Sequence, residues 1–285
     1  MPSAASRLRR LLKSGKLLVM PCCYDALSAK LVEQAGFRLT FMSGFAVSAA
    51  RLGLPDTGLI SYGEMVEQGR NICDAVNIPV IGDGDTGYGN VMNVKRTVRG
   101  YARAGFGCVM IEDQVAPKRC GHTLGKQVVG RDEALLRVRA AVDEGKKQNI
   151  LIMARTDARE TEGIEEALYR SEAFADLGAD IVFLEAPHSI GEMRFFCDRV
   201  SVAKMANMLQ QGRSPLLPPE QLEEIGYQIV AYPLTMISAA VQAMQQALKD
   251  LKNGCYPEHI SFDELKNVIG FAEYDQEEKR YMNGE

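Results

Sequence analysis

A thiol, two fixed positive charges and a histidine stand within five consecutive positions of the 285-residue sequence. These residues are Lys118, Arg119, Cys120, Gly121 and His122, and His122 is one of only three histidines. A thiol exchanges protons near neutral pH only when its pKa falls from about 8.5, and neighbouring Lys, Arg or protonated His side chains lower it. The segment therefore predicts a cysteine that transfers a proton.

An acidic, glycine-rich segment precedes this loop. Residues 82–87 read Gly-Asp-Gly-Asp-Thr-Gly, so that the carboxylates of Asp83 and Asp85 stand among glycines. Carboxylate oxygens suit a hard divalent cation, and glycines would let the cation approach the backbone closely. An Asp-Gly turn without a metal is the alternative. A cation site together with a cationic cysteine loop indicates carboxylate substrates held by a metal.

The composition is that of a globular protein, with 46% hydrophobic and 25% charged residues. A net charge of −4 gives no electrostatic reason to expect a nucleic-acid or membrane partner. Apolar runs such as 107–111 are far shorter than the ~20 residues of a spanning helix, and basic residues interrupt the N-terminal segment where a signal peptide would be apolar. Seven cysteines without zinc or disulfide spacing favour reduced thiols, so we expect a cytoplasmic protein.

Short apolar runs alternate with longer helical patterns along the chain. The predicted strands are Leu17–Pro21, Leu39–Ser43, Pro79–Asp83, Cys108–Glu112, Leu151–Arg155, Ile181–Glu185, Ser201–Asn207 and Gln228–Tyr232. The predicted helices are Ala26–Ala35, Ser61–Ala75, Met92–Ala104, Arg131–Lys146, Ile164–Leu177, Gly191–Arg199, Pro219–Ile225 and Met236–Leu251. Glycine ends several helices just before a strand, at positions 36, 105, 178 and 226. The alternation predicts an α/β protein, a single (β/α)₈ barrel domain over residues 1–285 whose last part, from about 252, is a helical extension.

Polar residues gather where the predicted strands end. They are Ser43-Gly44, Asp83 and Asp85, Glu112-Asp113, Arg155 and Asp157, Glu185 and Asn207. The βα loops of this fold converge on that face of the barrel and carry the functional groups. We therefore predict an active site on the C-terminal rim.

These residues resemble the isocitrate lyase/phosphoenolpyruvate mutase superfamily, over nearly the whole chain. The similar segments, in order, are 43–45, 52–56, 83–87, 112–114, 118–122, 154–158 and 185–186. The resemblance implies a barrel whose eighth helix is swapped between subunits, usually in a homotetramer, with Mg²⁺ or Mn²⁺ at the barrel mouth. The Lys-Arg-Cys-Gly-His loop is similar to that of the carbon–carbon lyase branch, whereas the mutases and phosphonopyruvate hydrolases carry a loop without cysteine.

The resemblance implies cleavage of the C2–C3 bond of a 2-hydroxy acid, which gives a 2-oxo acid such as pyruvate and a carboxylate carbanion. Asp85 would be the direct metal ligand, and Asp83, Asp56 and Glu112 would bind the metal directly or through water. Cys120 would protonate the carbanion, with Lys118, Arg119 and His122 in the same catalytic loop; a solvated charged loop is the alternative for Lys118 and Arg119.

Further residues would bind the substrate carboxylates. Ser43 and the backbone N–H groups of Gly44 and Phe45 would hold the 2-oxo acid half, Asn207 would hold the other half, and Gly121 would lie beside the substrate with Cys120. Arg155 would clamp a carboxylate, or else pair with Asp157. Glu185 would orient Arg155 or His122, with pairing to a helix or loop as the alternative.

Two positions bear on the substrate. Ser238 stands where 2-methylisocitrate lyases carry the arginine for a third carboxylate, and Pro233 stands where oxaloacetate hydrolases tend to have serine. Both favour a lyase for 2-alkyl- or 2,3-dialkylmalates. The alternatives are a 2-methylisocitrate lyase with a cation from elsewhere, such as Arg213, a carboxyphosphonoenolpyruvate phosphonomutase, an oxaloacetate hydrolase or decarboxylase, and a barrel without catalysis.

Overall fold

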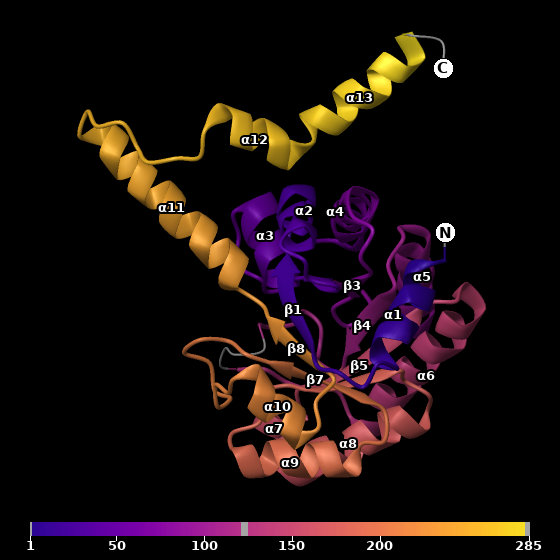
Figure 1. Ribbon diagram of the computed structural model, residues 1–285. Coiled ribbons are helices and arrows are strands. Elements are labelled where there is room, and N and C mark those ends of the chain that lie inside the picture. The colour runs from indigo at the N-terminus through magenta and orange to yellow at the C-terminus, as the bar shows by residue number, and fades with distance from the viewer. Residues whose placement is uncertain (1, 121–124, 283–285) are drawn as a thin grey trace. The chain divides into compact units, whose positions relative to one another are not determined.

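Eight parallel strands close into a barrel in the computed structural model, which describes residues 2–120 and 125–282 (Figure 1). The strands are β1 Leu18–Cys23, β2 Thr40–Met42, β3 Val80–Asp83, β4 Cys108–Glu112, β5 Leu151–Thr156, β6 Ile181–Leu184, β7 Ala203–Asn207 and β8 Ile229–Tyr232. Each strand pairs with the next, and β8 closes the ring on β1 through the pairs from Leu18–Ile229 to Pro21–Tyr232. The prediction of a (β/α)₈ barrel is confirmed.

Helices connect the strands around the outside of the barrel (Figure 1). They are α2 Ala26–Gln34, α3 Gly44–Leu52, α4 Tyr62–Ala75, α5 Val91–Arg103, α6 Arg131–Gln148, α7 Ala158–Thr161, α8 Ile164–Asp176, α9 Ile190–Arg199 and α10 Pro219–Ile225, and α1 Ala4–Leu12 precedes the first strand. Glycines 36, 105, 178 and 226 all have positive φ, between 87° and 110°, which explains why glycine follows these helices.

Helices α1, α3 and α7 are absent from the sequence-based prediction. Helix α1 buries Ala5, Leu8 and Leu11, three positions apart, although a serine and three arginines occupy the positions between them. Those three residues join the apolar cluster inside the barrel, so α1 extends the core of the barrel. Helix α7 has only four residues, too few for a periodic pattern.

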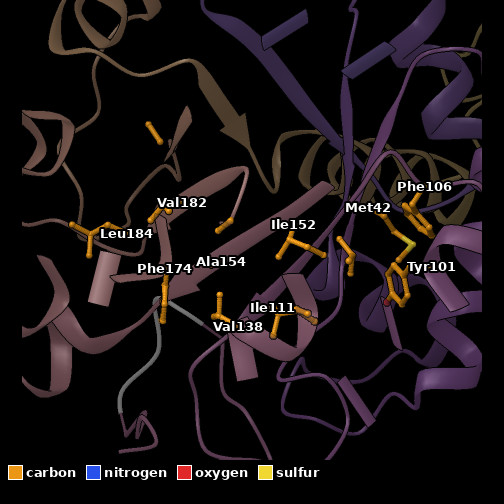
Figure 2. Close-up of a cluster of buried hydrophobic side chains, with 14 of the residues drawn as sticks. Met42, Tyr101, Phe106, Ile111, Val138, Ile152, Ala154, Phe174, Val182 and Leu184 are labelled. Atoms are coloured by element: carbon orange, nitrogen blue, oxygen red, sulfur yellow. The ribbon is translucent and has the colours of Figure 1, made fainter. Parts of the chain in front are cut away.

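The second apolar cluster lies between the strands and the surrounding helices. Figure 2 shows part of it, including Met42, Tyr101, Phe106 and Ile152. The rings of Tyr101 and Phe106 stack with 4.8 Å between centroids. A Cβ atom at Gly82 would lie 2.7 Å from both rings, and one at Gly84 would lie 2.6 Å from the Met110 carbonyl oxygen. Gly82 and Gly84 therefore permit close packing of this segment against Tyr101 and Phe106 and against β4, and the approach of a cation to them stays a prediction.

Residues 237–285 form a second compact unit, separate from the barrel unit of residues 1–236. It contains most of α11 Thr235–Lys252, then α12 Phe262–Ile269 and α13 Phe271–Met282. None of the described residues in these helices is buried, and Met244 and Leu248 are 56% and 66% exposed. The assignment of the whole chain to one domain stays a prediction. Across the described residues, the helices are all too short or too polar to cross a bilayer.

Candidate active site

A pocket of about 630 Å³, a volume that includes its open mouth, lies at the C-terminal ends of the barrel strands. Every strand contributes to its lining, in chain order Cys22, Phe41, Asp83, Met110, Arg155, Phe183, Met205 with Asn207, and Ala231. The segments that follow the strands add Ser43, Phe45, Asp56, Lys118, Arg119, Cys120, Glu185, Leu209, Pro233 and Leu234. The structure thus gathers most of the candidate site residues around one cavity.

The pocket has an apolar floor beneath a polar rim. Phe41, Met110, Phe183 and Met205 belong to the apolar cluster inside the barrel, and their side chains close the pocket from below. The carboxylates, amide, guanidinium and thiol stand at the strand ends and on the following segments. A ligand in this pocket would contact charged groups at the rim of the pocket and an apolar surface at its floor.

Four buried carboxylates surround the ammonium group of Lys118. Its Nζ lies 2.6 Å from Asp56 Oδ2 and 3.0 Å from Asp85 Oδ1. Burial lowers the pKa of Lys118, but the charges of Asp85, Asp83, Glu112 and Asp56 together raise it well above its ordinary value. Lys118 is therefore the counterion of the acidic cluster.

One ammonium does not satisfy this cluster. Burial raises the pKa of Asp85 to about 6 in spite of Lys118, and burial also raises the pKa of Glu112 well above its ordinary value. The buried Asp56 Oδ1 and Glu112 Oε1 accept no hydrogen bond from a described residue. The donor set, all oxygen and buried, thus fits a hard divalent cation. As they stand, no three acidic, cysteine or histidine side chains in the described part of the chain are arranged to hold a metal ion.

Asp83 binds two backbone segments. Its Oδ2 accepts a hydrogen bond from the Gly44 N–H at 3.2 Å, and its Oδ1 accepts one from the Asp85 N–H at 3.0 Å. A Cβ atom at residue 44 would lie 2.5 Å from Asp83 Oδ2, so a larger residue there would displace the Asp83 carboxylate from its hydrogen bond to the residue 44 N–H. The N–H of Gly44, which we expected to hold a substrate carboxylate, is therefore bonded to Asp83 in this structure. Asp85 itself has φ +47°, a left-handed conformation rarely adopted by residues other than glycine.

Ser43 has a structural contact that the sequence did not reveal. It caps α3, because its Oγ accepts a hydrogen bond from the Ala46 N–H at 3.3 Å. The residue still lines the pocket, and so does Phe45. The start of α3 thus lies at the rim.

Arg155 makes the contact with Asp157 that the sequence gave as one of two alternatives, and its place in the pocket lining leaves the other, a substrate carboxylate, as a prediction. It donates to Asp157 through Nε at 2.8 Å and through Nη2 at 2.9 Å, and it also lines the pocket. Its Nη2 lies 3.2 Å from Glu185 Oε2, and its Nε lies 3.4 Å from Glu112 Oε2. Burial lowers the pKa of Arg155, but these three carboxylates raise it well above its ordinary value.

Glu185 links Arg155 to the neighbouring amide. Its Oε1 accepts hydrogen bonds from the Ala186 N–H at 3.0 Å and from Asn207 Nδ2 at 3.4 Å. The expected contact between Glu185 and Arg155 is present. Its alternative partner, His122, lies outside the described residues together with Gly121.

The loop that carries Cys120 is held at its base. The side-chain amide of Gln114 accepts from the Arg119 N–H at 2.9 Å and donates to the Arg119 carbonyl oxygen at 3.0 Å. The Val115 N–H donates to the Gln127 carbonyl oxygen at 2.8 Å. These contacts fix the backbone beside Cys120, whose half-buried side chain faces the pocket.

Several residues near the site were missed or misjudged from the sequence. Asp113, read there as part of an acidic pair at the rim, points away from the pocket and accepts from Thr156 Oγ1 at 2.7 Å and from Arg170 Nη1 at 3.0 Å. Lys126, Gln114 and Tyr101, whose hydroxyl donates to the Asp83 carbonyl oxygen, also had no role assigned. No local pattern shows which groups they bind, because their partners are 5 to 31 positions away in the chain.

Arg213, the cation considered for a third carboxylate, lies outside the pocket lining. Its Nη1 forms an ion pair with Glu160 Oε1. Glu160 also lies 3.6 Å from His188 Nε2. Pro233, in contrast, lines the pocket directly.

A closed barrel that gathers acids, an arginine and a thiol over an apolar floor defines a (β/α)₈-barrel enzyme with a site for small anionic ligands. The chain belongs to the phosphoenolpyruvate phosphomutase family, which it matches over residues 8–252. It is 40% identical over 287 residues to the 2,3-dimethylmalate lyase of Eubacterium barkeri, with 99% of both chains covered. It is 42% identical over 246 residues to a probable 2-methylisocitrate lyase of Corynebacterium glutamicum, covering 86% of this chain and 80% of the relative.

Solved structures are also similar over nearly the whole chain. A 2,3-dimethylmalate lyase, described as a member of the PEP mutase/isocitrate lyase superfamily, has a TM-score of 0.94 at 35% identity, with 99% and 96% of the two chains covered. An oxaloacetate acetylhydrolase bound to 3,3-difluorooxalacetate has a TM-score of 0.93 at 34% identity, covering 99% and 97%. A phosphonopyruvate hydrolase bound to oxalate and Mg²⁺ has a TM-score of 0.87 at 28% identity, covering 99% and 100%.

Proposed function

We propose that this protein is a Mg²⁺-dependent carbon–carbon lyase that cleaves 2-alkyl- or 2,3-dialkylmalates to a 2-oxo acid such as pyruvate and a short carboxylate. One observation carries the proposal: the pocket combines a rim of charged groups and a thiol with an apolar floor. A malate with alkyl substituents needs both surfaces, because its carboxylates require charged partners and its alkyl groups favour apolar contact. The name of the 40%-identical lyase supports the same substrate class.

Asp85 is the proposed direct ligand of Mg²⁺ or Mn²⁺, with Asp83, Asp56 and Glu112 binding directly or through water. When bound, the cation would supply positive charge for the oxygens of the 2-hydroxy acid and favour loss of the hydroxyl proton. The excess of buried carboxylates over the single Lys118 ammonium supports this assignment. So does the Mg²⁺ in the related hydrolase structure.

Cys120 is the proposed proton donor. A base removes the hydroxyl proton, C2 becomes a carbonyl carbon, and the electrons of the C2–C3 bond remain on C3. The Cys120 thiol then donates its proton to C3, and solvent restores the thiol before the next turnover. Lys118, Arg119 and His122 are proposed to supply positive charge around this loop.

The remaining rim residues would orient the substrate. Arg155 would bind one carboxylate with the part of its guanidinium that faces the pocket, and Glu185 would hold that guanidinium and the Asn207 amide in place. Ser43, the Phe45 N–H and, after release from Asp83, the Gly44 N–H would bind the 2-oxo acid half. Gly121 would lie beside the substrate with Cys120.

A 2-methylisocitrate lyase is the second candidate, favoured by the name of the 42%-identical relative. Its substrate has a third carboxylate, which needs another cation. The Arg213 guanidinium already pairs with Glu160, and Ser238 offers no charge. The observed contacts therefore favour the dicarboxylate.

The test is release of pyruvate from a panel of 2-hydroxy acids in the presence of Mg²⁺, followed with lactate dehydrogenase and NADH. We expect 2,3-dimethylmalate or a similar alkylmalate to have the highest kcat/KM. Faster cleavage of 2-methylisocitrate, with a loss of that activity in Arg213→Ala, would favour the second candidate. Oxalate and acetate formation from oxaloacetate, with no pyruvate from any hydroxy acid, would overturn the lyase proposal.

We also propose that the protein is a cytoplasmic homotetramer, a dimer of dimers that exchange the eighth helix. The exposed apolar side chains of α11 support exchange, because burial against a partner would remove them from water.

A further inference from the structure

The carboxylate of Asp157 lies between two cations, and neither Asp157 nor Lys126 reaches the pocket lining. Its Oδ1 accepts a hydrogen bond from Lys126 Nζ and another from Arg155 Nη2, each at 2.9 Å. The Lys126 side chain is 1% exposed, and that of Asp157 is fully buried. Lys126 and Arg155 therefore share a single, buried oxygen atom.

The position of Asp157 is fixed from the other side as well. Its backbone N–H donates to Asp113 Oδ1 at 2.9 Å, and Asp113 in turn accepts from Arg170 Nη1. Asp113 and Arg170 thus fix the backbone of Asp157. The negative charge of its carboxylate is offset by the positive charges of Lys126 and Arg155. Lys126 also faces Glu160, whose pKa it helps to lower.

Arg155 faces three acidic groups, namely Asp157, Glu185 and Glu112. A substrate carboxylate has to compete with them for the guanidinium. Without the Lys126 charge, Asp157 would attract Arg155 more strongly, because Coulomb forces act with little screening in a buried site. The guanidinium would then be held back from the pocket.

We propose that Lys126 is a positioning residue that keeps Arg155 available to the substrate by neutralising part of the Asp157 charge. This inference rests on the proposed role of Arg155 as a carboxylate clamp. Lys126 also follows Cys120 on the same loop, and the adjacent Gln127 carbonyl pairs with the Val115 N–H. The Asp157 carboxylate thus links Lys126, which follows Cys120 in the chain, to the guanidinium of Arg155.

The experiment compares Lys126→Met with Lys204→Met. Lys204 is a matched control, since it is buried at 9% exposure but donates to the carbonyl oxygens of Cys197 and Val200. Both variants remove a buried ammonium, so both should lower the melting temperature. Oxalate, which has a carboxylate at each end, is titrated calorimetrically with Mg²⁺ present, and kcat and KM are measured for the best substrate of the wild type.

We expect Lys126→Met to weaken oxalate binding at least tenfold and to lower kcat/KM on the order of 10²-fold, as small misplacements of a binding group do. Lys126→Arg should restore most of the affinity, and Lys204→Met should bind oxalate within twofold of the wild type. If folded Lys126→Met behaves like Lys204→Met in both assays, the inference is wrong while the proposed function stands.

Should Lys126→Met fail to fold, Lys126→Gln replaces it, because glutamine keeps an N–H donor for Asp157 but no charge. Oxalate affinity within twofold of wild type in that variant would overturn the inference. A wild-type protein that cleaves no 2-hydroxy acid and binds no oxalate would overturn both the proposed function and the inference.

Discussion

Lys118 Nζ lies 3.0 Å from Asp85 Oδ1, and each side chain is only 6% exposed. The ammonium of the cysteine loop is therefore the counterion of the acid that we propose as the metal ligand. A divalent cation that binds here competes with Lys118 for the same carboxylates. We therefore expect metal binding at this proposed site to be coupled electrostatically to the position of Lys118.

Replacing Lys118 should make the fold depend on metal. Lys118→Met leaves four buried acids without their ammonium, and breaking a buried ion pair costs ~3–5 kcal/mol. We expect a lower melting temperature without metal and a larger rise on adding Mg²⁺ than in the wild type, because a cation that binds only the folded state stabilises it. Differential scanning calorimetry across a Mg²⁺ series measures both. Equal Mg²⁺-dependent shifts in the two proteins would show that Lys118 and the metal do not share these carboxylates.

Removing Asp85 should abolish metal-dependent turnover. Asp85→Ala takes away the proposed direct ligand, and we expect the fold to persist because Lys118 keeps its ion pair with Asp56. Isothermal titration with Mn²⁺ and a circular dichroism spectrum separate loss of metal from loss of structure. Unchanged activity and metal requirement would remove Asp85 from the metal site.

Replacing the thiol tests the proton donor. Cys120→Ser keeps the shape of the side chain, but an alkyl hydroxyl is far less acidic than a thiol, so cleavage should fall by ~10²-fold or more while pyruvate and Mg²⁺ still bind. Single-turnover kinetics and product titration measure the two effects. Near wild-type turnover in this variant would exclude the thiol mechanism.

Alkylation provides an independent check of the same residue. Iodoacetamide should inactivate the wild type and the control Cys255→Ser alike, because Cys255 is exposed and far along the chain in the second unit. Cys22 also lines the pocket, but burial raises its pKa well above the ordinary value and should protect it. Peptide mapping identifies the modified cysteine.

Two glycines of the same helix should respond to alanine in opposite directions. A Cβ atom at Gly69 of α4 would lie 2.3 Å from the buried Phe106 ring, whereas one at Gly63 meets only Ser61 Oγ at 3.9 Å. Gly63→Ala should raise the free energy of unfolding by up to about 1 kcal/mol through helix propensity. Overpacking costs ~1–3 kcal/mol, so Gly69→Ala should be less stable than Gly63→Ala by about that amount. Urea unfolding of both variants gives the difference, and equal stabilities would mean that the core around Phe106 adjusts freely.

The exposed apolar residues of α11 predict an oligomer. Light scattering at micromolar concentration should give the mass of a tetramer, and Met244→Glu with Leu248→Glu should reduce it, because these side chains are 56% and 66% exposed in the single chain. Leu136→Glu on α6 is the control, since Leu136 is 55% exposed on the barrel unit. A monomeric wild type would refute the prediction.

The barrel could be predicted from the sequence because short, mostly apolar runs alternate with helical patterns, and six of the eight predicted strands end in a polar residue. The limits of β4 and α10 agree with the prediction residue for residue, and the glycines after four helices have the expected positive φ. Alternation in a strand also explains the main error at the rim. Neighbouring residues point to opposite faces, so Glu112 joins the acidic cluster while Asp113 turns toward Thr156 and Arg170.

Contacts between distant segments could not be predicted. Lys118 meets Asp56 across 62 positions, and Lys126 meets Asp157 across 31. The sequence shows that these lysines and aspartates are present, but their pairing depends on how the closed barrel brings distant segments together. The same is true of Gly44, whose lack of a side chain is explained by the Asp83 carboxylate beside it.

Asp83 also limits how this site can change. Its two oxygens serve two different backbone N–H groups, those of Gly44 and Asp85. Asparagine has the same size but only one acceptor oxygen, and glutamate carries its two oxygens one carbon further out. Asp83→Asn therefore has to release either the Gly44 N–H at the start of α3 or the Asp85 N–H. A variant library that aims to alter the metal preference should therefore vary position 83 together with residues 44 and 85.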